Sequence, residues 1–180
     1  PIEGGLMLPQ NLHELERIRR QCKTIVTKRS VVSGAAALIP VPGTDIAVDI
    51  ALLTHLIKTI NKKFGLTEEQ MSKYDTWTQM LLFDVMKKTG AQIVGKAITK
   101  ELIVALIKKM GFRITIRQLA KYIPIVGQTA SVAISVSAVL YVGNNHIREC
   151  HRIVKNTIFA KQGKSTFKAS LSQIASWFWT

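Results

Sequence analysis

Apolar residues recur at helical spacing through most of the chain. In residues 11–29 they recur every three or four positions, at Leu12, Leu15, Ile18, Cys22 and the adjacent pair Ile25 and Val26. This spacing is typical of an amphipathic helix that buries one stripe and exposes a polar face. The same helix is expected to run on into residues 31–39, where small and apolar residues occupy every side.

Two short segments interrupt the helical pattern and predict corners of the chain. The first contains Pro40, Pro42, Gly43 and Asp45, and the second contains Pro124 and Gly127. Proline ends an incoming helix, and glycine allows the backbone to turn. An apolar helix is expected after each corner, over 46–63 and 128–142, the latter continuing through 145–161. We therefore predict two apolar helical hairpins.

The remaining elements are also predicted to be helical. Thr67 and Gln70 are spaced as a capping box, and Thr76 begins a helix with Trp77, Met80, Leu81 and Val85 on one side. A further helix begins near Thr99, and residues 162–164 are expected to break the chain before a last amphipathic helix. The predicted fold class is all-α, a multi-helix bundle with two Pro/Gly-bent hairpins. Its expected parts are an extension (1–10), a helical domain (11–161) and a C-terminal helix (162–180).

Positive charge dominates the composition and is unevenly distributed. The 180 residues contain 25 Lys and Arg against 11 Asp and Glu, for a net charge of +14. The excess lies in residues 13–29, 87–121 and 148–168, whereas residues 30–86 are slightly acidic. Such a field favours anionic partners, either phospholipid headgroups or nucleic acid phosphates.

The basic stretches favour a membrane surface as the partner. The cations that we expect to contact it are Arg17, Arg19, Arg20, Lys100, Lys108, Lys109, Arg113 and Arg117. Trp177 and Trp179 suit an interfacial aromatic anchor, although packing of the last helix would explain them equally well. The best candidate for insertion is 125–142, but a span needs about 20 apolar residues, so we expect a buried core helix in the resting protein.

No constellation of residues predicts an enzyme, a cofactor or a metal centre. His146 and Cys150 are four residues apart and could share a metal, but no second pair supplies the other ligands of a zinc site. Cys22 and Cys150 are expected to be free thiols, with one disulfide left open. Residues 163–166 (GKST) look like the end of a phosphate-binding loop, but Ile158 stands where its first glycine would be.

Residues 31–70 resemble a known helical family. The marks are the corner at Pro40, Pro42, Gly43 and Asp45, the phrase Phe64-Gly65-Leu66, and the second corner at 123–127. In these features the chain resembles the helical domain of unknown function that is fused to bacterial Era-like GTPases. It is also similar to the C-terminal helical domain of immunity-related GTPases. The resemblance, which covers about residues 10–157, implies an all-helical, membrane-associated bacterial protein without catalytic residues; the GTPase domain itself is absent.

Two functions follow as hypotheses. In the first, the chain is an effector or toxin module that is secreted into a target cell and permeabilises an anionic membrane there, and an immunity or chaperone protein holds it before use. A start at Pro1 would suit release by proteolysis. In the second, it is a membrane-docking adaptor of a GTPase-like system without pore activity. Nucleic-acid binding ranks third, because the basic stretches contain few aromatic residues. Self-association is an additional expectation for a pore.

Overall fold

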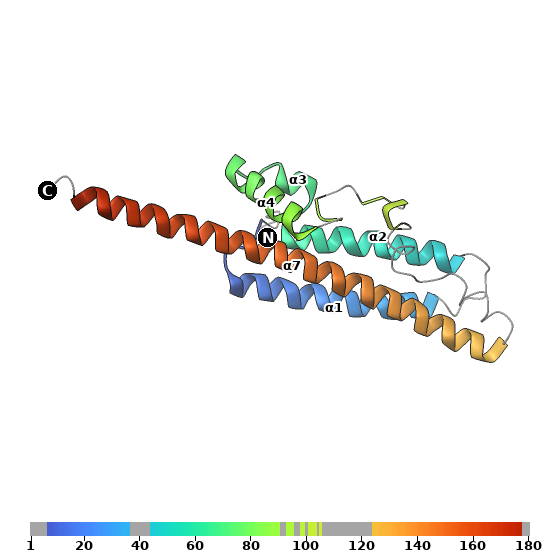
Figure 1. Ribbon diagram of the computed structural model, residues 1–180. Coiled ribbons are helices and arrows are strands. Elements are labelled where there is room, and N and C mark those ends of the chain that lie inside the picture. Colours follow the sequence, from blue (N-terminus) through green and yellow to red (C-terminus); the bar gives the residue numbers. More distant parts are fainter. Residues whose placement is uncertain are drawn as a thin grey trace, which may run out of the picture.

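The fold is an assembly of helices around one long central helix (Figure 1). The computed structural model describes residues 7–36, 44–90, 93–95, 98–99, 101–103, 105 and 124–177, with side chains described within 7–35, 50–90 and 136–163 and in the short stretches between 93 and 105. The bounded helices are α1 (Leu12–Ala36), α2 (Thr44–Phe64), α3 (Glu68–Met71), α4 (Thr76–Thr89) and α7 (Pro124–Trp177). The described residues contain no strand, and the all-α prediction is confirmed.

The core lies where α1, α2 and α7 pack together. Helices α2 and α7 run in the same direction and α1 runs against them (Figure 1). The fully buried side chains of this core include Leu15, Ile18, Leu53, Leu56, Ile57, Ile60, Ile147 and Ile153. Gly143 of α7 lies where the three helices come closest, because a Cβ added there would be 2.7 Å from Val26 and 3.2 Å from Leu56. Burial of these apolar stripes is the main force that holds the bundle together.

Local signals set the ends of α1 and α2. Asn11 caps α1, since its Oδ1 accepts the backbone N–H of Glu14 at 2.9 Å. At the end of α2, Leu66 N–H donates to the carbonyl of Asn61 (2.9 Å) and Gly65 N–H donates to the carbonyl of Lys62 (3.3 Å). This is the Schellman arrangement, and Gly65 takes the left-handed conformation that it requires, with φ of 74°.

Helices α3 and α4 form a small layer on the C-terminal part of the bundle. The predicted capping box between Thr67 and Gln70 is present, and Asp75 caps α4 by accepting the N–H of Thr78. The predicted face of α4 is correct in part: Val85 is buried and Leu81 packs against the core, but Met80 is exposed, whereas Leu82 is buried. Residues 80–83 are all apolar, so the position of α7, rather than the local pattern, decides which of them is covered.

Helix α7 is continuous over 54 residues and corrects two expectations. Gly127 lies inside the helix instead of at a corner, and Pro124 is its first residue, a position where proline loses no helical hydrogen bond. The break expected at residues 162–164 is also absent. A single glycine costs a helix only about 1 kcal/mol, and Gly163 is spanned without a bend in the ribbon, so that the C-terminal part of α7 extends past the other helices (Figure 1).

Three helix termini meet at one end of the bundle. The end of α1 at Ala36, the start of α2 at Thr44 and the start of α7 at Pro124 all lie there (Figure 1). The first predicted corner, with Pro40, Pro42 and Gly43, falls outside the described residues, and Asp45 lies inside α2. Among the described helices, none combines the length and apolar character needed to cross a bilayer.

Candidate membrane-binding surface

The solvent-facing side of α7 carries basic and aromatic residues in one line. Tyr141, Arg148, Arg152, Lys155 and Phe159 are all exposed, and their spacing of seven, four, three and four residues places them along a single helical stripe. The two aromatic side chains are half-exposed, at 52% for Tyr141 and 46% for Phe159. We name these five residues the α7 stripe. It spans 18 residues, which is about 27 Å of helix.

The ion pairs among the described residues include none of the three cations of the α7 stripe. Glu149 is the acidic residue of α7 within 136–163, and its carboxylate is turned toward His146, 3.7 Å from Nδ1. Arg148 donates to Asn145 Oδ1, and Arg152 donates to the carbonyl of Thr89 at the end of α4 (3.0 Å). Neutral acceptors hold these guanidinium groups without removing their charge.

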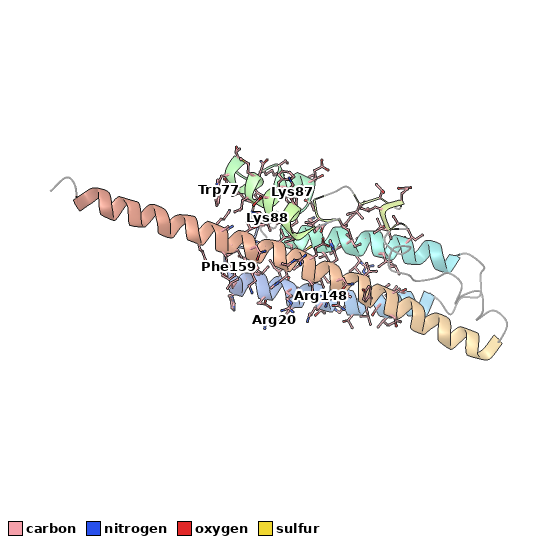
Figure 2. All side chains as sticks on the ribbon, viewed as in Figure 1. Arg20, Trp77, Lys87, Lys88, Arg148 and Phe159 are labelled. Carbon is pink, nitrogen blue, oxygen red and sulfur yellow. The ribbon has the colours of Figure 1, made fainter. Side chains whose placement is uncertain are left out.

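Lys155 and Phe159 form a mixed cationic and aromatic end of the stripe. The Lys155 ammonium lies 5.7 Å from the centre of the Phe159 ring, within the range of a cation–π interaction. Figure 2 shows Phe159 and Arg148 on α7, about three helical turns apart, with Arg20 on the neighbouring α1. A ring beside an ammonium group suits the boundary between headgroups and acyl chains.

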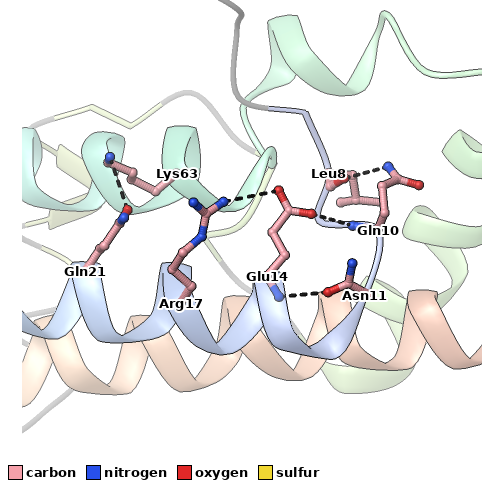
Figure 3. Close-up of polar contacts among 7 residues, drawn as sticks. All are labelled: Leu8, Gln10, Asn11, Glu14, Arg17, Gln21 and Lys63. Atoms are coloured by element: carbon pink, nitrogen blue, oxygen red, sulfur yellow. Dashed lines mark hydrogen bonds and ion pairs between the residues drawn. The ribbon is translucent and has the colours of Figure 1, made fainter.

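The three arginines predicted on α1 differ in how far they are available. Arg17 forms an ion pair with Glu14 at 3.8 Å (Figure 3), and Arg19 is paired with Glu16 at 3.2 Å. Arg20 is exposed and has no ion pair with another described residue. Of the three, Arg20 therefore contributes most to the basic surface, together with the exposed Lys23 and Lys28 of the same helix.

The other residues that were predicted to contact a membrane lie outside the part of the chain whose side chains the structure describes. These are Lys100, Lys108, Lys109, Arg113, Arg117 and Trp179, as well as the side chain of Trp177, the last residue of α7. Sequence reasoning noted the basic stretch 148–168 but did not select the individual residues of the α7 stripe. Their common heptad-like spacing, from Tyr141 through Arg148 to Lys155, was the signal that could have found them.

The last turns of α1 expose two apolar side chains at the end of the bundle where the helix termini meet. Val31 and Val32, in the last turns of α1, are 65% and 50% exposed. Lys28 and Arg29 lie one turn earlier in the same helix. An exposed apolar end with cations one turn behind it resembles the arrangement of an interfacial membrane contact.

The candidate metal pair, His146 and Cys150, belongs to a buried hydrogen-bonded cluster. His146 Nε2 lies 2.7 Å from Asn61 Oδ1, and the Cys150 thiol lies 3.6 Å from the same oxygen. An amide oxygen that accepts from both groups requires the proton on Nε2 of His146. The described residues hold no group of three potential ligands, so the cluster joins α2 to α7 as a hydrogen-bonded contact.

Both thiols are free and buried. Burial raises the pKa of Cys22 to about 12, with the Lys63 charge acting weakly in the opposite direction. Burial also raises the pKa of Cys150, and the nearby Glu149 and Cys22 raise it further. The two thiols are therefore protonated at neutral pH and unsuited to act as nucleophiles.

No family model matches the chain, and no solved structure matches it.

Proposed function

We propose that this protein binds anionic membranes through the α7 stripe and the adjoining basic residues of α1. The observation that carries the proposal is the line of three cations between two half-exposed aromatic side chains, with no acidic residue among the described positions of the α7 stripe. Each Lys or Arg near an anionic lipid surface contributes about 1 kcal/mol. The three cations of the stripe alone therefore supply about 3 kcal/mol, and the rings add interfacial contact.

The same surface fits nucleic acid less well. Single-stranded nucleic acid stacks its successive bases on closely spaced aromatic rings. Here the two rings stand at opposite ends of a stripe about 27 Å long, and the Phe159 ring already lies beside the Lys155 ammonium. Phosphate attraction alone would remain, without a platform for bases.

A vesicle-binding experiment tests the proposal. The chain is incubated with vesicles of phosphatidylcholine alone or with 30 mol% phosphatidylglycerol, and the bound fraction is measured by sedimentation. Lys155→Glu replaces attraction by repulsion, so it should weaken binding by about 2 kcal/mol, roughly 30-fold. The matched control, Lys58→Glu, reverses an exposed charge on α2 and should change binding less than about threefold.

Three results would contradict the proposal. They are equal losses in the two variants, binding that does not weaken as salt rises from 0.05 to 0.5 M, and the absence of binding to anionic vesicles. Displacement of the vesicles by a short DNA duplex at equal phosphate concentration would favour the nucleic-acid alternative.

Membrane permeabilisation is a second candidate, favoured by the exposed apolar side chains in the last turns of α1. Exposed Val31 and Val32 lie at the end where α1, α2 and α7 have their termini, and insertion of this end would disturb the bilayer locally. Release of an encapsulated dye from anionic vesicles tests it. Val31→Asp should suppress release while leaving binding through the α7 stripe intact. Binding without any release by the unmodified chain would instead support the adaptor hypothesis.

A further inference from the structure

The register between α1 and α7 is defined by two contacts. His151 Nε2 lies 2.7 Å from Glu16 Oε1, and Gly143 lies against Val26. Because the helices are antiparallel and rise equally per residue, a residue of α1 and its level neighbour on α7 have numbers that add to about 168. Arg20 is therefore level with Arg148, and Lys23 lies about one turn further along α1. Figure 2 shows Arg20 and Arg148 at neighbouring positions on the two helices.

Arg20, Lys23 and Arg148 lie on the same side of the contact between α1 and α7. Glu16 and His151 mark this side because they meet across it. At 100° per residue, Lys23 lies within about 20° of Glu16 around α1, and Arg20 about 40° from it on the solvent side. Arg148 lies about 60° from His151, also on the solvent side. All three residues are exposed. Their long side chains can therefore converge on the solvent side of the contact between the two helices.

Glu16, the acidic residue on this side of the helix pair, is already engaged. Glu16 accepts from His151 at 2.7 Å and from Arg19 at 3.2 Å. Arg148 has one guanidinium nitrogen bound to the neutral Asn145 side chain, which orients the group and leaves its other N–H donors for a ligand. Within the described part of the chain, Arg20, Lys23 and Arg148 form no ion pair with a carboxylate. Three like charges gathered on one side of a helix pair repel one another unless an anion joins them.

We propose that Arg20, Lys23 and Arg148 form a binding site for a phosphate monoester group. Two guanidinium groups can each offer a planar pair of N–H donors to phosphate oxygens, and a lysine adds a point charge. A monoester carries up to two charges and three free oxygens, more than a phosphodiester headgroup offers. This inference rests on the proposed function, because the site would select one kind of anionic lipid, namely one with a phosphatidate-like headgroup. The site can also be tested with soluble phosphate.

Headgroup selectivity is the first test. Vesicles with phosphatidic acid and vesicles with phosphatidylserine are prepared at matched surface potential, and binding of the full chain is compared at 0.15 M salt. We expect about tenfold tighter binding to phosphatidic acid, the effect of one additional good charge-assisted contact. In the double variant Arg20→Gln/Arg148→Gln this preference should fall below about twofold.

A matched variant separates the site from general charge. Lys58→Gln/Lys73→Gln also removes two positive charges, but from exposed positions elsewhere on the protein. It should weaken binding to both membranes alike and keep the preference for phosphatidic acid. Equal binding of the unmodified chain to the two membranes would overturn selection of a lipid-held phosphate monoester while leaving the anionic-surface proposal in place. Loss of the preference in the matched variant would overturn it too.

Soluble phosphate distinguishes the sources of the ligand and keeps the site testable if no vesicle is bound. The melting temperature is measured with 20 mM inorganic phosphate and with chloride at equal ionic strength. A rise with phosphate that is lost in Arg20→Gln/Arg148→Gln supports the site and shows that a free phosphate is sufficient. A membrane preference without this rise supports it for a lipid-held group only. If neither the rise in melting temperature nor the membrane preference is observed, the site is refuted.

Discussion

Replacement of Gly143 by alanine probes the point where the three long helices meet. A Cβ at this position would lie 2.7 and 2.8 Å from the two methyl carbons of Val26 and 3.2 Å from Leu56 Cδ2. The valine methyl groups cannot retreat easily, because a β-branched side chain in a helix has one strongly preferred rotamer. Either the helices move apart or Val26 leaves its rotamer.

The magnitude follows from two opposing effects. Alanine in place of glycine stabilises a helix interior by about 0.5–1 kcal/mol, whereas overpacking a close contact costs about 1–3 kcal/mol. Gly143→Ala should therefore destabilise the protein by about 1–2 kcal/mol, a fall of roughly 2–8 °C in melting temperature for a chain of this size. Gly163→Ala lies in the same helix with nothing within 4 Å of the added carbon, and it should stabilise by about 0.5–1 kcal/mol.

Urea unfolding followed by circular dichroism measures both variants. Their difference isolates the steric cost, because the gain in helix propensity is common to them. Val26→Ala should be less harmful, or even beneficial, in the Gly143→Ala background than in the unmodified chain, with a coupling energy of about 1 kcal/mol or more. If the two glycine variants agree within about 0.5 kcal/mol, the close approach of α1 and α2 to Gly143 is refuted.

Three further predictions concern polar groups of the bundle. Asn61→Ala should cost about 1–3 kcal/mol in urea unfolding, because it removes the acceptor of His146 and Cys150; an effect below about 0.5 kcal/mol would contradict the pairing. Burial alone would raise the pKa of Glu16, but hydrogen bonds and charges from His151 and Arg19 lower it overall. This carboxylate therefore stabilises the fold above the pKa of an unfolded glutamate, and the contribution is lost as pH falls through the lower folded-state value. Glu16→Gln should lower the free energy of unfolding at pH 7 by less than about 1 kcal/mol, because the side chain is 45% exposed. A difference in stability that persisted at pH 3 would be inconsistent with this role of the carboxylate. The buried thiols should be alkylated only as fast as the chain unfolds, so rapid labelling of either cysteine in the native protein would contradict their burial.

Several features of the fold were predictable because their causes are local. The Thr67–Gln70 capping box, the end of α2 at Gly65 and the helical stripe of α1 depend on residues within a few positions of one another. Backbone hydrogen bonding and side-chain spacing act over that same range. The two errors in α7, at Gly127 and at residues 162–164, arose where a glycine was interpreted as a break although its cost is only about 1 kcal/mol.

The candidate surface could be predicted only in part. The basic character of residues 13–29 and 148–168 follows directly from composition. Which of their cations are available does not, because Arg17 and Arg19 have carboxylate partners and Arg20 has none among the described residues. A run of charged residues winds around a helix, so its sequence alone does not say which positions face solvent together.

Composition and contacts between near neighbours along the chain are enough to make this protein helical, strongly basic and capped at recognisable positions. The packing of the helices was needed to show which face of α7 is exposed, that Asn61 meets His146 across 85 residues of sequence, and that Arg20 of α1 is level with Arg148 of α7. These relationships depend on how the helices slide and rotate against one another. That register is set by the packing of apolar side chains around Gly143, which no local pattern encodes.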